Sequence, residues 1–277
     1  MDMIREEMSF FDPALALRGQ TAENPPDFVA NFSEKLLSAI TVGGDGASDT
    51  RACHAAIDVT AGSGDQISAT GSTVTIEAGA STTITGSSVA ITAAGNSAIT
   101  LAATNSTVNA KGKITLTVSG SSDTANLDTG STVSLSGTGE TLTLTSGFVT
   151  IGAASSATVT GDNNYVKALS NCSSQLNGVH EVVDISGTGA LASTSNSTII
   201  FEANASGMLS GASDTLALFG GASATLAGAS FSSGSSGNSL TLGQDGKTVS
   251  GNNMSISVAA GGSVAVVGSG NTISALG

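Results

Sequence analysis

Bulky aromatic side chains and positive charges are what this sequence of 277 residues has least of. Trp is absent, Tyr occurs once and Phe eight times, so aromatic residues make up only 3% of the chain. We therefore expect a narrow core built from Ala, Val, Ile and Leu. Eight basic residues stand against 21 acidic ones, and the net charge of −13 argues against nucleic acid or anionic membrane surfaces as partners.

Long apolar runs are also missing. No window approaches the roughly 18 apolar residues from which a transmembrane helix is predicted, and the acidic N-terminus lacks the apolar stretch of a Sec signal peptide. Export would need another route, such as type I secretion. The 39% of hydrophobic residues and the mean hydropathy of +0.25 argue against disorder, which normally accompanies low hydropathy and high charge.

Cysteine and histidine are scarce. Cys53 and Cys172 are the two cysteines, and the sequence is compatible with a disulfide between them or with two free thiols. Together with His54 and His180 they provide the residue types of a zinc site, but their spacing is not that of a local zinc motif.

Catalytic motifs are missing as well. The sequence contains no GxSxG, P-loop or HExxH pattern. Glu181 and Asp184 form the one carboxylate pair that we consider as a candidate for sugar hydrolysis. We predict that the protein is not an enzyme.

Short runs of alternating apolar and polar residues are what the sequence has in quantity. Val74-Thr75-Ile76, Ile99-Thr100-Leu101 and Leu142-Thr143-Leu144 are examples, and Gly, Ser, Asn and Ala separate them. Alternation of this kind between turn-forming residues is typical of half-buried β-strands. The runs recur so regularly that they indicate a repeat protein.

The length of the repeat follows from one inward aliphatic residue per strand. Every third of these residues (Ile76, Leu101, Leu127, Ile151) gives steps of 25, 26 and 24 along the sequence, whereas every second one gives steps between 15 and 19. We therefore predict an all-β, single-chain parallel β-solenoid with three-sided coils of about 25 residues, in preference to two-sided coils of about 17.

Residues 1–40 differ in composition from the rest, and we predict a short helical segment there. Asn24-Pro25-Pro26-Asp27 has the residues of a helix start. Apolar residues follow at intervals of four, at Phe28, Phe32, Leu36 and Ile40. The segment either caps the solenoid or docks onto a partner, and the pair Phe10-Phe11 favours docking because one short helix hides few apolar side chains.

Residues 41–70 form a transition to the solenoid. Asp45 and Asp49 are weak candidates for binding calcium, since Ser48 stands where the calcium-binding nonapeptide needs Asp. We predict no other cofactor. Residues 71–277 are assigned to the β-solenoid, with an elaborated coil near 161–185.

Outward-facing residues suggest two kinds of ligand. On a coil of the predicted length, Thr75, Thr100 and Thr150 lie one coil apart, with Asn126 in register. Thr-x-Thr pairs do not line up on one face of such a coil, so the sequence does not favour ice binding. Sugar binding usually requires aromatic platforms, for which the candidates are Tyr165, Phe148, Phe201, Phe219 and Phe231. We expect the phenylalanines to fill the core instead.

The segment from Val74 to Leu144, with TVTI, TTIT, ITLTV and TLTLT strands between Gly, Ser and Asn turns, resembles bacterial β-strand-repeat surface proteins of the adhesin or S-layer-like kind. These proteins are exported by type I systems. The resemblance implies an extracellular or cell-surface location and a structural or adhesive role. The chain departs from autotransporter-type adhesins because it lacks a Sec signal and a translocator domain.

The two ends of the solenoid carry the functional prediction. An uncovered last coil exposes unpaired N–H and C=O groups, which are a template for another chain. We predict a non-enzymatic structural subunit that associates with itself head to tail into a filament. The residues assigned to self-association are Phe10, Phe11, Phe28, Phe32, Leu36, Ile273 and Leu276. The alternatives are an adhesin or glycan-binding module and, after it, a polysaccharide-degrading β-helix enzyme.

Overall fold

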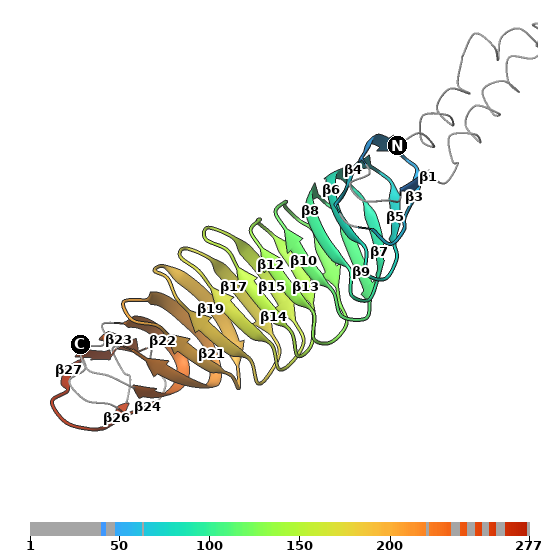
Figure 1. Cartoon of the computed structure of the whole chain (residues 1–277). Helices are drawn as coiled ribbons and strands as arrows, with labels where there is room; N and C mark the ends of the chain where they lie inside the picture. Colours follow the sequence, from blue (N-terminus) through green and yellow to red (C-terminus); the bar gives the residue numbers. More distant parts are fainter. Residues whose placement is uncertain are drawn as a thin grey trace, which may run out of the picture. The chain divides into compact units, whose positions relative to one another are not determined.

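The computed structural model is a parallel β-solenoid, as the sequence predicts (Figure 1). It describes residues 40–42, 48–62, 64–219, 222–233, 239–242, 247–250, 255–258 and 264–275. Within these ranges the secondary structure consists of 27 β-strands without a helix. The helical segment predicted for residues 1–40 lies outside the described residues, apart from Ile40.

Each coil contributes two strands, and successive coils stack so that equivalent strands pair in parallel. Most strands pair with the strand two places earlier and two places later, which builds two faces. The strands of face A are β1 (Ile40–Val42), β3 (Ala56–Val59), β5 (Thr73–Ile76), β7 (Ala90–Ala94), β9 (Thr107–Lys111), β11 (Thr124–Asn126), β13 (Glu140–Thr143), β15 (Ser156–Thr160), β17 (Ser173–Asn177), β19 (Ala190–Ser195), β23 (Ser239–Leu242), β25 (Ser255–Val258) and β27 (Thr272–Ala275).

The second ladder of parallel strands forms face B. Its strands are β2 (Ser48–Cys53), β4 (Asp65–Thr70), β6 (Ser81–Ser87), β8 (Ala98–Thr104), β10 (Thr115–Val118), β12 (Thr132–Leu135), β14 (Phe148–Ile151), β16 (Tyr165–Ala168), β18 (Val182–Ile185), β20 (Thr198–Phe201), β24 (Lys247–Ser250) and β26 (Val264–Val267). Two long strands, β21 (Ser206–Leu218) and β22 (Ser223–Ser233), continue from face A to face B and so join the two ladders.

The prediction of three-sided coils is wrong, because each coil has two strands and is correspondingly shorter. Val74 pairs with Ile91, and Ile91 pairs with Val108, so the repeat is 17 and not 25. Most strands have two or three inward positions, and the aliphatic residues used to measure the repeat occupied different ones. Ile76, for example, pairs with Ala93 and not with Ile91. Because inward positions from different columns were compared, the measured steps did not give the true repeat of 17.

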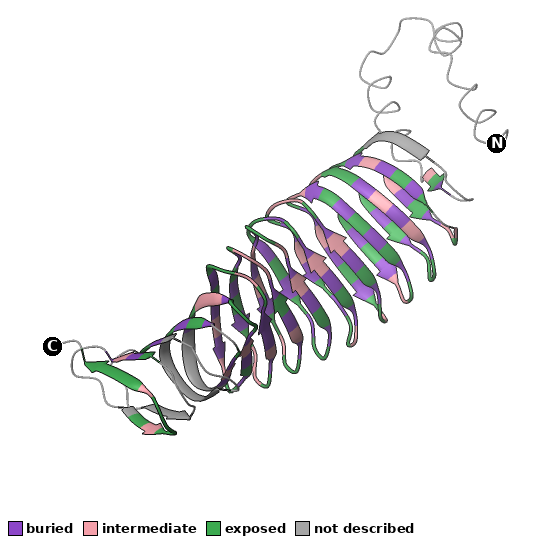
Figure 2. Cartoon of the chain, turned by 60° about the vertical axis from the view of Figure 1, so that its left-hand side comes forward, coloured by how far each residue is buried: buried purple, intermediate pink, exposed green. Residues whose placement is uncertain are grey.

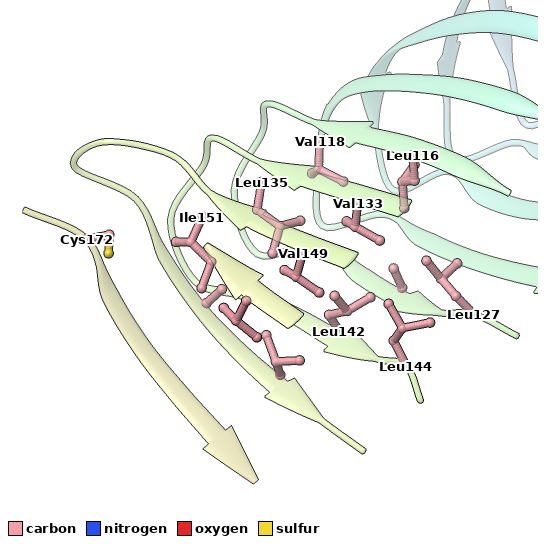
Figure 3. Close-up of a cluster of buried hydrophobic side chains, with 14 of the residues drawn as sticks. Leu116, Val118, Leu127, Val133, Leu135, Leu142, Leu144, Val149, Ile151 and Cys172 are labelled. Carbon is pink, nitrogen blue, oxygen red and sulfur yellow. The ribbon is translucent and has the colours of Figure 1, made fainter. Parts of the chain in front are cut away.

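The core lies between the two faces and is made of aliphatic columns. Buried and exposed residues alternate along most strands, which appear as purple and green bands in Figure 2. Leu116, Val133 and Val149 stack in one column of face B, because parallel pairing places them opposite one another (Figure 3). All three are at most 1% exposed. The absence of bulky side chains predicted this narrow core correctly.

The corner that leads from face B to face A repeats more strictly than the aliphatic residues do. Residues in the left-handed region of φ recur at this corner once per coil, at His54, Gly71, Ser88, Asn105, Ser122 and Gly139. Glycine, asparagine and similar short polar residues adopt this conformation most readily. The same rhythm continues through residues 161–185, where β16 pairs with β14 and with β18 in register. The predicted elaborated coil is therefore an ordinary one.

Candidate functional site

The residue after most left-handed corner residues points inward, and many of these inward residues are polar. At the corner from face B to face A, Oδ1 of Asp123 accepts a hydrogen bond from the N–H of Ser106, with 2.7 Å between N and O. Oε2 of Glu140 accepts from the N–H of Asp123 at 3.0 Å. Ser106 in turn accepts from the N–H of Val89 through its hydroxyl at 3.1 Å. Each side chain thus ties its own coil to the coil before it.

The opposite corner holds a second ladder of this kind. Asn164 accepts from the N–H of Gly147 at 3.0 Å, Glu181 accepts from the N–H of Asn164 at 3.0 Å, and Ser197 accepts from the N–H of Glu181 at 3.2 Å. Glu181 is 1% exposed and Asn164 is 1% exposed. Both ladders were missed from the sequence. A search for polar residues that follow His, Asn, Ser or Gly at the spacing of one coil could have found them.

Burial is the main cause of the raised pKa values of the ladder carboxyls. Burial raises the pKa of Glu140 to about 7, against the effect of the hydrogen bond from Asp123 and with a smaller contribution from the Asp123 charge. Burial likewise raises the pKa of Glu181 to about 7 and raises the pKa of Asp123. Oδ2 of Asp123 and Oε1 of Glu140 have no hydrogen-bond partner. The cavity beside these two carboxyls measures about 10 Å³, which leaves no room for a substrate.

The outer surface of face A carries a regular array of threonine and asparagine. The pairing registers place two outward positions of each strand from β5 to β15 in two straight columns. We call these positions the Thr/Asn array: Thr73, Thr75, Ala90, Thr92, Thr107, Asn109, Thr124, Asn126, Thr141, Thr143, Thr158 and Thr160. Nine of the twelve are threonine and none is charged. Asn126 Nδ2 donates to Asn109 Oδ1 at 2.9 Å, so the asparagines link neighbouring coils.

Outward threonines line up on one face, although complete Thr-x-Thr pairs occur on only three of the six array strands, β5, β13 and β15. Thr75 pairs with Thr92 on face A, whereas Thr100 and Thr150 lie on face B. From β1 to β17 every coil-to-coil step on face A has the same length of 17, as in the pair Asn109 and Asn126. Face B is less regular, because its step is one position shorter between Thr132 and Phe148.

Face B has an exposed aromatic pair instead. Phe148 is 60% exposed, and its ring centroid lies 5.8 Å from that of Tyr165 in the next coil, with 45° between the ring planes. The Tyr165 hydroxyl donates to Oδ2 of Asp184 at 2.9 Å, and this bond raises the pKa of Tyr165. Lys167 stands in register with Asp184. Phe201 fills the core as expected, but Phe148 and Phe219 do not, since Phe219 is 40% exposed. The side chain of Phe231 lies outside the described part.

A shallow groove of about 520 Å³ crosses face A at the C-terminal end of the array and includes Thr158 of β15. Ser156, Thr158, Gln175 and Ser193 contribute hydroxyl and amide groups to its lining, together with Leu191 and Met208. Leu191 is 45% exposed and Met208 is 53% exposed. The step between β17 and β19 is one position longer than the steps before it, since Ser173 pairs with Leu191. The groove therefore marks where the regular face ends.

The residues that the sequence assigned to chemistry do not come together. Glu181 occupies an inner corner, whereas Asp184 lies at an outward position of β18 and is covered by its neighbours, so the candidate carboxylate pair is split between the two sides of the sheet. Cys53 is exposed and free, and Cys172 is buried and free, so no disulfide joins them. His54 and His180 are left-handed corner residues at different corners.

The metal and self-association candidates are only partly within the described residues. Asp45 lies outside them, and only the backbone of Asp49 is described, as part of β2. The described ranges contain no group of three His, Cys, Asp or Glu side chains placed to hold a metal ion. Of the self-association residues, Ile273 is described and is 52% exposed. The others, Phe10, Phe11, Phe28, Phe32, Leu36 and Leu276, lie outside the described part of the chain.

Across the part of the chain that the structure describes, no helix has the length and apolar character needed to cross a membrane. Comparison of the chain with protein-family models, with curated proteins and with solved structures finds no match.

Proposed function

We propose that this protein is a non-enzymatic structural subunit that associates with itself, head to tail, into a filament. The observation that carries the proposal is the exposure of Ile273. Ile273 pairs with Ile256 in the inner column of face A, yet Ile256 is 1% exposed and Ile273 is 52% exposed. A further coil stacked on β27 would bury Ile273 as the coil of β27 buries Ile256. We propose that a second copy of the chain supplies that coil.

The direction of the strands favours head-to-tail stacking. All described pairings are parallel, and β27 pairs with β25 alone among the described strands. A second copy that faces the same way continues the parallel ladder, whereas a copy that faces the opposite way would need antiparallel pairing. Contacts between two different surfaces of identical subunits lead to open filaments unless they close into a ring. The second edge of a strand that is paired on one side offers the backbone groups that such a contact uses.

The proposal places the filament outside the cell or at the cell surface. Its support is the composition of the chain. The outward positions of the solenoid are rich in threonine, asparagine and serine, and the net charge of −13 for the whole chain keeps copies apart except where specific contacts form. An export route without a Sec signal, such as type I secretion, belongs to the same proposal.

A charge on the exposed coil of β27 tests the proposed contact. In the variant Ile273→Lys, a charged side chain on the exposed edge strand opposes pairing with another chain. Met208→Lys is the matched control, because Met208 is similarly exposed, at 53%, but lies in the middle of the stack. Sedimentation velocity should show large assemblies for the unaltered protein and for Met208→Lys, and monomers for Ile273→Lys. Monomers in all three samples contradict the proposal.

The aromatic pair of face B favours a second candidate function, a glycan-binding module. Sugar rings stack on exposed aromatic faces, and Phe148 offers such a face beside the Tyr165 hydroxyl and Lys167. Phe148→Ala should abolish retention of the protein on insoluble polysaccharides such as cellulose or chitin. Phe219→Ala is the control, since Phe219 is also exposed but lies away from the pair. Equal retention of both variants, or no retention of the unaltered protein, contradicts this candidate.

A further inference from the structure

The Thr/Asn array differs from an ordinary solvent-exposed β-face in its regularity and in its lack of charge. All steps between its coils have the same length, and its strands run from β5 to β15 without a bulge or a register shift. We infer that this face binds ice, by holding water in positions that match the lattice at an ice surface. This inference goes beyond the proposed filament and does not depend on it.

The geometry of a parallel stack supplies the lattice match. Neighbouring strands lie about 4.8 Å apart, and two outward residues on one strand are separated by about 6.6 Å. The spacing between strands lies close to the shorter repeat of the water oxygens on the prism faces of hexagonal ice, and the spacing along a strand lies about a tenth below the longer one. Each threonine presents one hydroxyl and one methyl group, so water is hydrogen-bonded at the hydroxyls and ordered over the methyl groups between them. The array therefore repeats both features in two dimensions.

The charge of the surface agrees with a neutral hydrogen-bonding partner. None of the twelve array positions is ionisable, although the chain as a whole carries a net charge of −13. Ionised side chains hold water in their own geometry, and they would disturb a lattice. From β14 onward the corresponding columns of face B contain Phe148, Tyr165 and Lys167, so face B loses the flat outline and the neutrality there, after the uncharged outward positions of its strands from β4 to β12.

The extent of the array is limited to one part of the molecule. Toward the C-terminus it ends after β15, where Gln175 and then Ser193 follow Thr158 in register, and the step from β17 to β19 lengthens by one position. The face available to ice is therefore the row of strands from β5 to β15. This limit makes the proposal testable by substitutions inside and outside the row.

Adsorption to a single ice crystal is the direct test. The purified chain is labelled with a maleimide dye at Cys53, which is exposed, whereas Cys172 is buried and stays unlabelled. An ice hemisphere grown in the labelled solution should take up the dye on its prism planes, and ice-recrystallisation inhibition should rise with protein concentration. Exclusion of the dye from the ice overturns the inference.

Two matched variants separate the array from the rest of the surface. Thr143→Tyr puts a large ring on β13, inside the array, and Thr132→Tyr puts the same ring on face B, where the neighbour in register is already Phe148. Both side chains are exposed, so both variants should keep the melting temperature. Thr143→Tyr should lose most of the ice-recrystallisation inhibition and Thr132→Tyr should keep it. Equal activity of the two variants overturns the inference. A second result would also overturn the inference: the unaltered protein does not adsorb to ice, and Thr143→Tyr disrupts its side-by-side assembly. The array would then bind a second copy of the chain.

Discussion

The backbone N–H of Asp123 donates a hydrogen bond to Oε2 of Glu140 at 3.0 Å, so one buried carboxyl group stands directly beside the next in the stack of coils. Each of these carboxyls satisfies a backbone donor of the preceding coil, at the point where the chain turns and has no strand partner in its own coil. The cost of burying the acid is reduced when the group is neutral.

Stability should therefore fall as the pH rises. The pKa of Glu140 and that of Glu181 are about 7 in the folded chain, against an ordinary value of 4.5, so both groups bind their protons more tightly when the chain is folded. Each protonated carboxyl contributes to the free energy of unfolding, and this contribution is fully present below about pH 4.5. It is lost as the pH rises through about 7, and the loss is at most about 3 kcal/mol for each group. Melting followed by circular dichroism should give a higher midpoint at pH 5 than at pH 8.

The double variant Glu140→Gln, Glu181→Gln should remove most of this pH dependence, because the amide keeps a carbonyl oxygen for the backbone N–H and does not ionise. Glu77→Gln is the control, since Glu77 is exposed and also accepts a backbone hydrogen bond, from the N–H of Ala61. A double variant with the same pH dependence as Glu77→Gln would show that the buried carboxyls do not set it.

A cavity in the aliphatic column should destabilise the solenoid. Leu116 is fully buried between the columns of neighbouring coils, and Leu116→Ala should cost about 2–5 kcal/mol of unfolding free energy. Leu191→Ala, at a leucine that is 45% exposed, should change it by less than about 0.5 kcal/mol. Urea denaturation monitors both. Similar midpoints for the two variants would argue that Leu116 is not in a packed core.

Close stacking of the coils at the corner predicts that one glycine, Gly137, does not tolerate substitution. A Cβ atom at Gly137 would overlap the carbonyl oxygen of Gly120 in the preceding coil, and it would also meet Oε1 of Glu140. Gly137→Ala should therefore force the two coils apart and lower the melting temperature strongly. Gly79→Ala is the comparison: its Cβ meets nothing within 4 Å, and its φ of +77° adds strain of only about 1 kcal/mol. The opposite order of the two effects would contradict the corner geometry.

The two thiols should differ in reactivity. Cys53 is exposed, whereas Cys172 is 1% exposed and burial raises its pKa, which keeps it as the unreactive thiol. A thiol reagent such as Ellman's should titrate one cysteine in the folded protein and two in guanidinium. Immediate reaction of both thiols in buffer would mean that the coil around Cys172 is open, and reaction of neither would indicate a disulfide.

The β-solenoid architecture was predicted from the sequence, but the length of its coil was not. Alternation in runs such as Thr73–Ile76 established the strands, and the lack of aromatic residues predicted the narrow core. The period was missed because most strands have two or three inward positions, and aliphatic residues such as Ile76 and Ile91 occupy different ones. The corner residues mark the period without that ambiguity, since a left-handed φ is required once per corner, as at Ser88 and Asn105.

The candidate sites depended on that period. On the longer coil predicted from the sequence, Thr75 and Thr100 appeared to share a face, and the true neighbours of Thr75 remained unrecognised. On the shorter coil of the structure, Thr75 and Thr92 fall side by side, and the array emerges. The exposure of Phe148 could not be predicted from the sequence. Phe148 is the first residue of β14, and only the register of face B shows that this position points outward.

Negative-stain electron microscopy of the purified chain, at rising concentration, tests the proposed function most directly. Head-to-tail stacking on the open coil of Ile273 predicts unbranched filaments of constant width, which grow longer with concentration and are absent in Ile273→Lys. Isolated particles at every concentration, or filaments that persist in Ile273→Lys, would contradict self-association through this end of the solenoid.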